Sequence, residues 1–195
     1  MDIKTITCIC LLTFAVSAMS TKEKSPFTQE YTISNEQRGG GMSGNLDGLL
    51  TFDRQFGDGT SGGSCDYVGQ DSSNDGVAYA VFPFFSPSGQ MADLEVQLNT
   101  LGDSVLFIYC SFDPLNPADN LVAINDDGGV DFGSAISPAD MVQLDPQTTY
   151  YAVVTGFSLT DLSTFNLVLG GDLQFGEAVD DDLIFSDGFE ATPGL

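Results

Sequence analysis

The sequence of 195 residues contains no histidine and no tryptophan. Without histidine, neither a Ser-His-Asp nor a Cys-His nucleophilic system can be assembled, and zinc bound through histidine is excluded. An enzyme of this composition would depend on carboxylates, tyrosine or a few lysines. Without tryptophan, sugar stacking on exposed rings would rest on Tyr67, Tyr150 or Tyr151, because most other aromatic residues fall at alternating positions typical of a core.

Basic residues are also scarce. Five lysines and arginines stand against 28 acidic residues, and the formal net charge is −23. Such a surface repels phosphate backbones and anionic lipid headgroups, so we expect neither nucleic-acid binding nor membrane-surface binding. Divalent cations are the natural counter-charge for so many carboxylates.

No apolar run is long enough to span a bilayer, and the longest one begins near the N-terminus. The segment MDIKTITCICLLTFAVSAMS combines an early lysine, a short apolar stretch and small residues at its end. This layout is typical of a cleaved secretory signal, with cleavage after Ala18 or Ser20. We therefore predict a signal peptide over residues 1–20 and an exported protein that does not insert into a membrane.

Cysteine is sparse as well. Removal of the predicted signal peptide leaves two of the four cysteines, Cys65 and Cys110. In an oxidising compartment an even pair is most simply interpreted as one disulfide. Two free buried thiols are the alternative, because the sequence does not show whether the two residues face each other.

The remaining chain has the apolar content of a single globular domain. Residues 21–44 are polar and aperiodic, which predicts a flexible leader, and residues 173–195 form an acidic tail. Between them, residues 45–172 show short strands separated by turns rich in Gly, Pro, Asn and Asp, which predicts an all-β antiparallel sandwich. The expected strands are Val77–Phe85, Ala92–Leu98, Ser104–Ser111, the LVAI segment at 121–124, Thr149–Phe157 and Ser163–Gly171.

The order of these segments resembles a known family. The segments YCSFDPLNPADNLVAINDDGG and TTYYAVVTGF, with the strands VAYAVFPFFSPSG and NLVLGG around them, are similar to the bacterial pre-peptidase C-terminal domain. The resemblance covers roughly Leu46 to Gly171. It implies a jelly-roll-like β-sandwich of the kind that accompanies exported bacterial proteins. The protease that such a domain often follows is absent from this sequence.

The stretch NDDGG at 125–129 is the most suggestive motif. Calcium binds six to eight oxygens from carboxylates, amides and backbone carbonyls in a flexible loop. Asn125, Asp126 and Asp127 offer such oxygens, and Asp113 lies in the acidic segment upstream. The two segments flank the LVAI strand, so the sequence leaves open whether they meet. A plain turn is the alternative, since Asn, Asp and Gly are the preferred turn residues.

Together these observations predict a secreted, non-enzymatic binding or adhesion module at or outside the bacterial cell surface. Calcium is its expected cofactor, with Asp126, Asp127, Asp113 and Asn125 as the candidate ligands. Its partner would be an extracellular protein or polysaccharide. Two alternatives remain open: a polysaccharide hydrolase that uses two carboxylates, and a structural protein of a surface layer or matrix.

Overall fold

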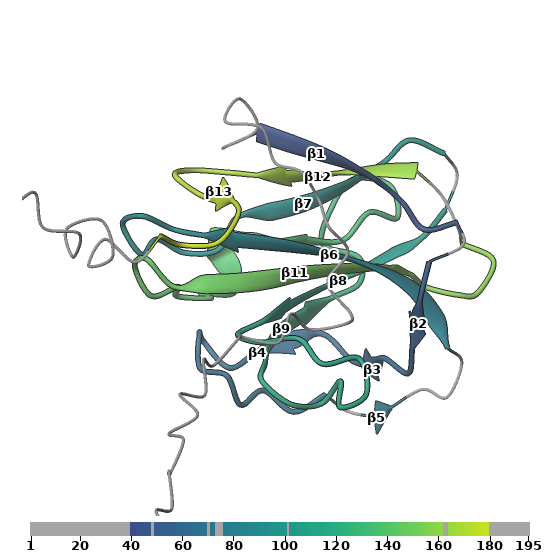
Figure 1. Cartoon of the computed structure of the whole chain (residues 1–195). Coiled ribbons are helices and arrows are strands. Elements are labelled where there is room, and N and C mark those ends of the chain that lie inside the picture. The colour runs from purple at the N-terminus through teal and green to yellow at the C-terminus, as the bar shows by residue number, and fades with distance from the viewer. Residues whose placement is uncertain are drawn as a thin grey trace, which may run out of the picture.

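The computed structural model shows an all-β protein (Figure 1). The predicted signal peptide, the leader up to residue 39, and the tail from residue 180 lie outside the described residues. The structure describes residues 40–47, 49–69, 71–72, 76–100, 102–161 and 164–179.

The smaller sheet contains four antiparallel strands in the order β1-β12-β7-β10. Its faces alternate between buried and exposed residues, as in β12, where Phe165, Leu167 and Leu169 are buried. One side of this sheet therefore faces the core and the other faces solvent. Its strands are β1 (Gly40–Asn45), β7 (Leu94–Leu98), β10 (Ala135–Ile136) and β12 (Thr164–Leu169).

The larger sheet has the order β13-β6-β11-β8-β9-β4, with β2 pairing beside β6. All of its pairings are antiparallel, and Figure 1 shows β6 and β11 beneath the layer of β1, β12 and β7. A separate pair, β3 (Gln55–Phe56) and β5 (Asp71–Ser72), lies outside the two sheets. The larger sheet is built from β2 (Thr51–Phe52), β4 (Gly59–Thr60), β6 (Val77–Phe85), β8 (Ser104–Tyr109), β9 (Leu121–Asn125), β11 (Thr149–Gly156) and β13 (Gln174–Phe175).

The main core fills the space between the two sheets. Phe82 of β6 packs edge-on against Phe165 of β12, with ring centroids 5.9 Å apart. Leu106 and Ile108 of β8 belong to the same buried cluster. Burial of this apolar surface is the main driving force for joining the two layers.

A second apolar cluster covers the opposite face of the larger sheet. Phe52, Tyr79 and Phe112 contact one another edge to face, with centroid distances of 5.1 to 5.5 Å. Phe107 and Tyr109 of β8 add to this cluster. Because β8 packs against apolar groups on both faces, all six of its residues are buried, which explains the unbroken apolar run from Val105 to Tyr109.

The predicted disulfide is present. Cys65 and Cys110 are joined with a Cα–Cα distance of 5.8 Å. The bond ties the segment that follows β4 to the end of β8, where Cys110 packs against the main core cluster. The alternative of two free thiols is thereby excluded.

The structure confirms the all-β sandwich and corrects its predicted limits, while the jelly-roll topology stays a prediction. The range predicted as a flexible leader, residues 21–44, contains most of β1, and Met42 of this strand is buried. The predicted tail, residues 173–195, begins with Leu173 and Phe175, which are both 1% exposed. The composition of GGMSGN hid the first strand, because one apolar residue among glycines gives no periodic signal.

Candidate metal site

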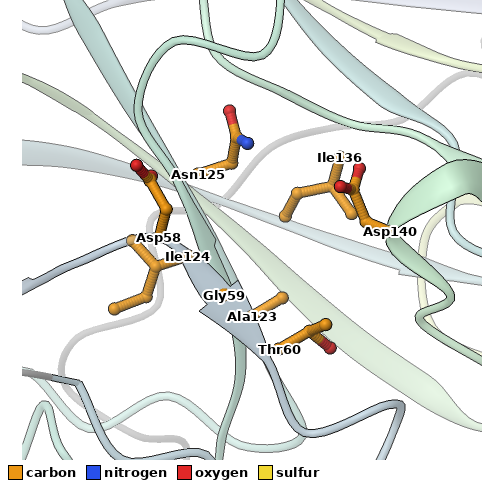
Figure 2. Close-up of a pocket in the computed structure, with 8 residues that line it drawn as sticks. All are labelled: Asp58, Gly59, Thr60, Ala123, Ile124, Asn125, Ile136 and Asp140. Atoms are coloured by element: carbon orange, nitrogen blue, oxygen red, sulfur yellow. The ribbon is translucent and has the colours of Figure 1, made fainter.

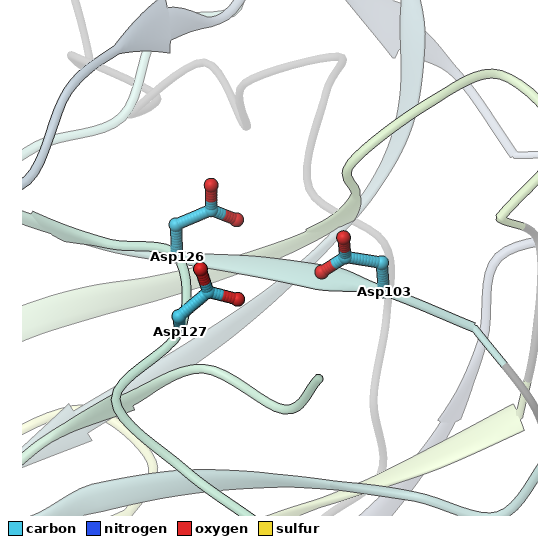
Figure 3. A group of neighbouring side chains, drawn as sticks. All are labelled: Asp103, Asp126 and Asp127. Atoms are coloured by element: carbon cyan, nitrogen blue, oxygen red, sulfur yellow. The ribbon is translucent and has the colours of Figure 1, made fainter. Parts of the chain in front are cut away.

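Three carboxylates converge at one end of the larger sheet. One oxygen from each of Asp103, Asp126 and Asp127 lies within 4.8 Å of the others. Figure 3 shows Asp126 and Asp127 side by side on one segment, with Asp103 facing them from another. These three residues are called the aspartate cluster below.

The antiparallel pairing of β8 and β9 creates the cluster. Asp103 immediately precedes β8, and Asp126 and Asp127 immediately follow β9. Leu106 pairs with Asn125, so the residues before Leu106 run alongside the residues after Asn125. A strand start and a strand end separated by more than twenty residues are thus brought together by the sheet itself.

Asn125 shapes the loop that follows β9. Its Oδ1 accepts hydrogen bonds from the backbone N–H of Gly128 at 2.7 Å and of Ala135 at 3.2 Å. A Cβ atom at Gly128 would lie 2.4 Å from the carbonyl oxygen of Ala135, so only glycine fits this close approach. The amide of Asn125 therefore acts as the internal support of residues 126–134, which we call the second acidic loop.

Two serines attach the second acidic loop to the start of β8. The backbone N–H of Ser134 donates to Oγ of Ser104 at 3.0 Å, and both residues are buried. The backbone N–H of Ser104 in turn donates to the carbonyl of Phe132 at 3.1 Å. These bonds hold Asp103 and the loop aspartates in a fixed relation.

The aspartate cluster is electrostatically strained. The pKa of Asp126 is raised to about 6, first by burial and then by the nearby carboxylates of Asp103, Asp127 and Asp58. The pKa of Asp103 is also raised, first by burial and then by Asp127 and Asp161. Loss of solvation and like-charge repulsion both disfavour the ionised carboxylate.

Arg54 is the one basic side chain of the described residues, and its positive charge acts on the aspartate cluster. It lowers the pKa of Asp103 and of Asp126, against the larger effects that raise them. Its guanidinium lies 4.7 Å from the ring centroid of Phe56 and 5.1 Å from that of Phe157, and it donates to the carbonyl of Phe157. Aromatic faces and a backbone oxygen contact this buried arginine, and its effect on the two carboxyl pKa values is smaller than the effects that raise them.

Two carboxylate oxygens of the cluster are left without hydrogen-bond partners. Oδ1 of Asp103 and Oδ1 of Asp126 are buried and accept no hydrogen bond within the described residues. Buried oxygens of this kind are costly unless a donor or a cation satisfies them. A hard cation such as calcium, which takes carboxylate and water oxygens, fits this donor set.

The other predicted ligand, Asp113, lies at the opposite end of β9. It belongs to residues 111–120, called the first acidic loop, which precede the strand, whereas the cluster follows it. Its Oδ2 accepts from Nδ2 of Asn116 at 2.8 Å and its Oδ1 accepts from the N–H of Leu115 at 2.9 Å. Asp113 is thus the centre of a closed turn, and the five-residue strand keeps it from Asp126.

Of the four predicted metal ligands, the structure brings Asp126 and Asp127 together, while Asn125 and Asp113 make hydrogen bonds within their own loops. Asp103 is the residue that sequence reasoning missed. The strands that form β8 and β9 were both predicted, and pairing them as an antiparallel hairpin would have placed Asp103 beside Asp126.

The tyrosines considered for sugar stacking do not form an exposed platform. Tyr150 is 2% exposed, and its hydroxyl accepts a hydrogen bond from the N–H of Asp145 at 3.0 Å. Tyr67 and Tyr151 are partly buried against the second apolar cluster. All three side chains serve mainly as packing groups.

Comparison of the chain with models of protein families, with curated proteins and with solved structures found no match in any of the three. The resemblance to the pre-peptidase C-terminal domain therefore stays a prediction. Within the described residues, no helix has the length and apolar character needed to cross a bilayer.

Proposed function

We propose that this protein is a secreted, non-enzymatic β-sandwich that works as an extracellular binding or adhesion module and takes calcium at Asp103, Asp126 and Asp127. The observation that carries the proposal is the convergence of three carboxylates, two of which have a buried oxygen without a hydrogen-bond partner. A cation bound there would neutralise charge that the folded chain otherwise concentrates.

The role proposed for calcium is structural. The aspartate cluster joins the start of β8 to the loop that leads into β10, and so it connects the larger sheet with the smaller one. A cation held only by the folded protein stabilises it by mass action, by about 2.7 kcal/mol at a hundredfold excess over its dissociation constant. The module would then be more rigid in a calcium-rich extracellular medium than in a medium without calcium.

The polysaccharide hydrolase is the second candidate, because the pKa of Asp126 is raised to about 6, as a general acid requires. The available space argues against it. Asp126 lines neither the cavity of about 210 Å³ beside Asn125 and Asp58 nor the more open one of about 390 Å³ beside Arg54 and Phe157. A chain of sugars with a general acid and its partner would need a longer cleft.

Thermal unfolding in excess EDTA, in millimolar calcium and in millimolar magnesium tests the proposal. We expect calcium to raise the melting temperature by several degrees and magnesium to raise it much less, because magnesium demands a stricter octahedral arrangement. Equal effects of the two cations would indicate general charge screening and would contradict the proposed calcium site. Release of reducing sugar from acidic or neutral polysaccharides, abolished in Asp126→Asn, would instead support the hydrolase.

A further inference from the structure

A second site lies on the open side of the sandwich, where the edge strands β4 and β10 approach each other. A cavity of about 210 Å³ lies there, and its lining includes Asp58, Thr60, Ala123, Asn125, Ile136 and Asp140. Figure 2 shows Asp58 and Asp140 on opposite sides of the lining, with Ala123 and Thr60 between them. We propose that this cavity binds the protonated lysine side chain of a partner protein.

The cavity exists because both edge strands are short. β4 pairs with β9 only at Gly59 and Thr60, and β10 pairs with β7 only over two residues. Gly59 contributes no side chain to the cavity wall. A Cβ atom at this position would lie 2.5 Å from the hydroxyl of Tyr67, and its φ of +150° also favours glycine. The side of the sandwich therefore stays open between the two sheets.

The floor of the cavity is apolar and reaches the main core. Ala123 and Ile136 are each 1% exposed and belong to the cluster between the sheets. A small residue at 123 leaves depth that a larger one would fill. Such a floor suits an alkyl stem, because a chain of methylene groups gains free energy when it leaves water.

The rim carries two oriented carboxylates. Oδ1 of Asp58 accepts from the N–H of Asp126 at 2.9 Å, and Oδ2 of Asp140 accepts from the N–H of Ser137 at 2.7 Å. Within the described residues, the second oxygen of each carboxylate accepts no hydrogen bond. An ammonium group carries three donors and would interact with these oxygens through charge-assisted bonds.

The surrounding charge selects for a cation. Arg54 is the only lysine or arginine in the described part of the chain, and it is 1% exposed. No described basic side chain therefore lies at the surface to compete for the carboxylates of the rim. A negative field of this kind also attracts basic partners over distances of about a Debye length.

The size of the cavity selects for a single side chain. Its volume of about 210 Å³ is below the range typical of drug-sized ligands. A lysine side chain matches the pattern of an apolar stem with one charged end. This inference rests on the proposed role as a binding module and adds the chemistry of the partner.

The test uses the full chain in saturating calcium and two capped peptides, Gly-Gly-Lys-Gly-Gly and the same peptide with norleucine in place of lysine. Calorimetric or NMR titration should show that the lysine peptide binds about tenfold more tightly, a difference of about 1.4 kcal/mol. Asp140→Asn keeps an acceptor for Ser137 while it removes the charge, and it should reduce this preference. Ala123→Val fills the floor without a charge change and should weaken binding as well.

Asp119→Asn is the matched control, because it removes one exposed charge from the first acidic loop at the other end of β9. Equal losses of affinity for the lysine peptide in Asp119→Asn and Asp140→Asn would indicate general electrostatic attraction and would contradict lysine binding in the cavity. Equal binding of the two peptides would overturn it too, as would tighter binding of free cadaverine than of the lysine peptide. The calcium response of the same samples is read separately, so a failure of the calcium site is distinguishable from a failure of this cavity.

Discussion

The two acidic loops on either side of β9 have similar compositions and opposite local chemistry. In the first acidic loop, hydrogen bonds from Asn116 and then from Leu115 hold the pKa of Asp113 below its usual range. In the second, burial and neighbouring carboxylates raise the pKa of Asp126 to about 6. The first loop satisfies its carboxylate internally, whereas the second leaves buried oxygens without donors.

This comparison shows that acidic composition alone does not define a cation site. The first acidic loop is closed by the N–H of Cys110, which donates to the carbonyl of Asn120, and by the hydroxyl of Tyr109, which donates to the carbonyl of Pro117. A turn that is complete in itself has little to gain from a metal. A cluster that concentrates unsatisfied charge gains much more.

The largest effect is expected from removal of the disulfide, which anchors the first acidic loop and not the second. The disulfide Cys65–Cys110 anchors the start of the first acidic loop and closes a segment of 45 residues. Replacing both cysteines by alanine should lower the free energy of unfolding by about 3 to 4 kcal/mol, because the unfolded chain regains its freedom. Urea denaturation measures this loss. The stabilisation by calcium should persist in the variant, and its disappearance would show that the aspartate cluster depends on the first loop.

Asp126→Asn sharpens the comparison at the cluster itself. In EDTA at pH 7 the substitution removes a repelled charge and should raise the free energy of unfolding by about 1 to 2 kcal/mol, after a discount for solvent screening. In calcium most of the cation-dependent stabilisation should be lost. Denaturation with and without calcium measures both effects.

Asp113→Asn is the matched control for that variant, since it makes the same chemical change in the first acidic loop. It weakens the hydrogen bonds to Asn116 and Leu115, so a small loss of stability is expected in EDTA and in calcium alike. A calcium response reduced as strongly in Asp113→Asn as in Asp126→Asn would contradict the distinction between the two loops.

The smallest expected effect concerns pH in the absence of calcium. The pKa of Asp126 is about 6 in the folded protein, against about 3.9 in an unfolded chain. The folded state therefore binds the proton of Asp126 more tightly than the unfolded chain does. The stabilisation that this tighter binding gives the folded state is fully present below about pH 4 and is lost as the pH rises through about 6. Between pH 5 and 7.5 in EDTA, the protein should lose about 1 kcal/mol of stability relative to Asp126→Asn. A difference that is constant over this range would place Asp126 in an ordinary solvated environment.

The lowered pKa values of Asp113 and Asp172 act in the opposite direction and in another range. Hydrogen bonds favour their ionised forms. Their contribution to stability is present above the unfolded pKa and is lost as pH falls through the lower folded pKa. Any change of stability between pH 5 and 7.5 therefore comes from Asp126 and its neighbours and not from Asp113 or Asp172.

Much of the fold could be predicted from local pattern. The alternation in Leu94–Leu98 and the apolar runs at Val77–Phe85 and Ser104–Tyr109 indicated strands where the structure has them. Period-two alternation and turn residues are local properties, and local properties are what a sequence displays directly.

The candidate site was only half predictable for the same reason. Asp126 and Asp127 are neighbours in a conspicuous motif, whereas Asp103 precedes a different strand and joins them only through the pairing of β8 with β9. The cavity proposed to bind lysine likewise depends on where β4 and β10 end in space. Neither arrangement leaves a continuous pattern in the chain.

The sequence by itself determined the all-β class, most strand positions, the scarcity of positive charge and the exclusion of histidine chemistry. Only the tertiary structure decided that Cys65 meets Cys110, that Asp113 stays apart from Asp126, and that Asp103 completes the aspartate cluster. The physical reason is that composition and periodicity act within a few residues. Sheet register and the order of strands instead set contacts between residues far apart in the chain.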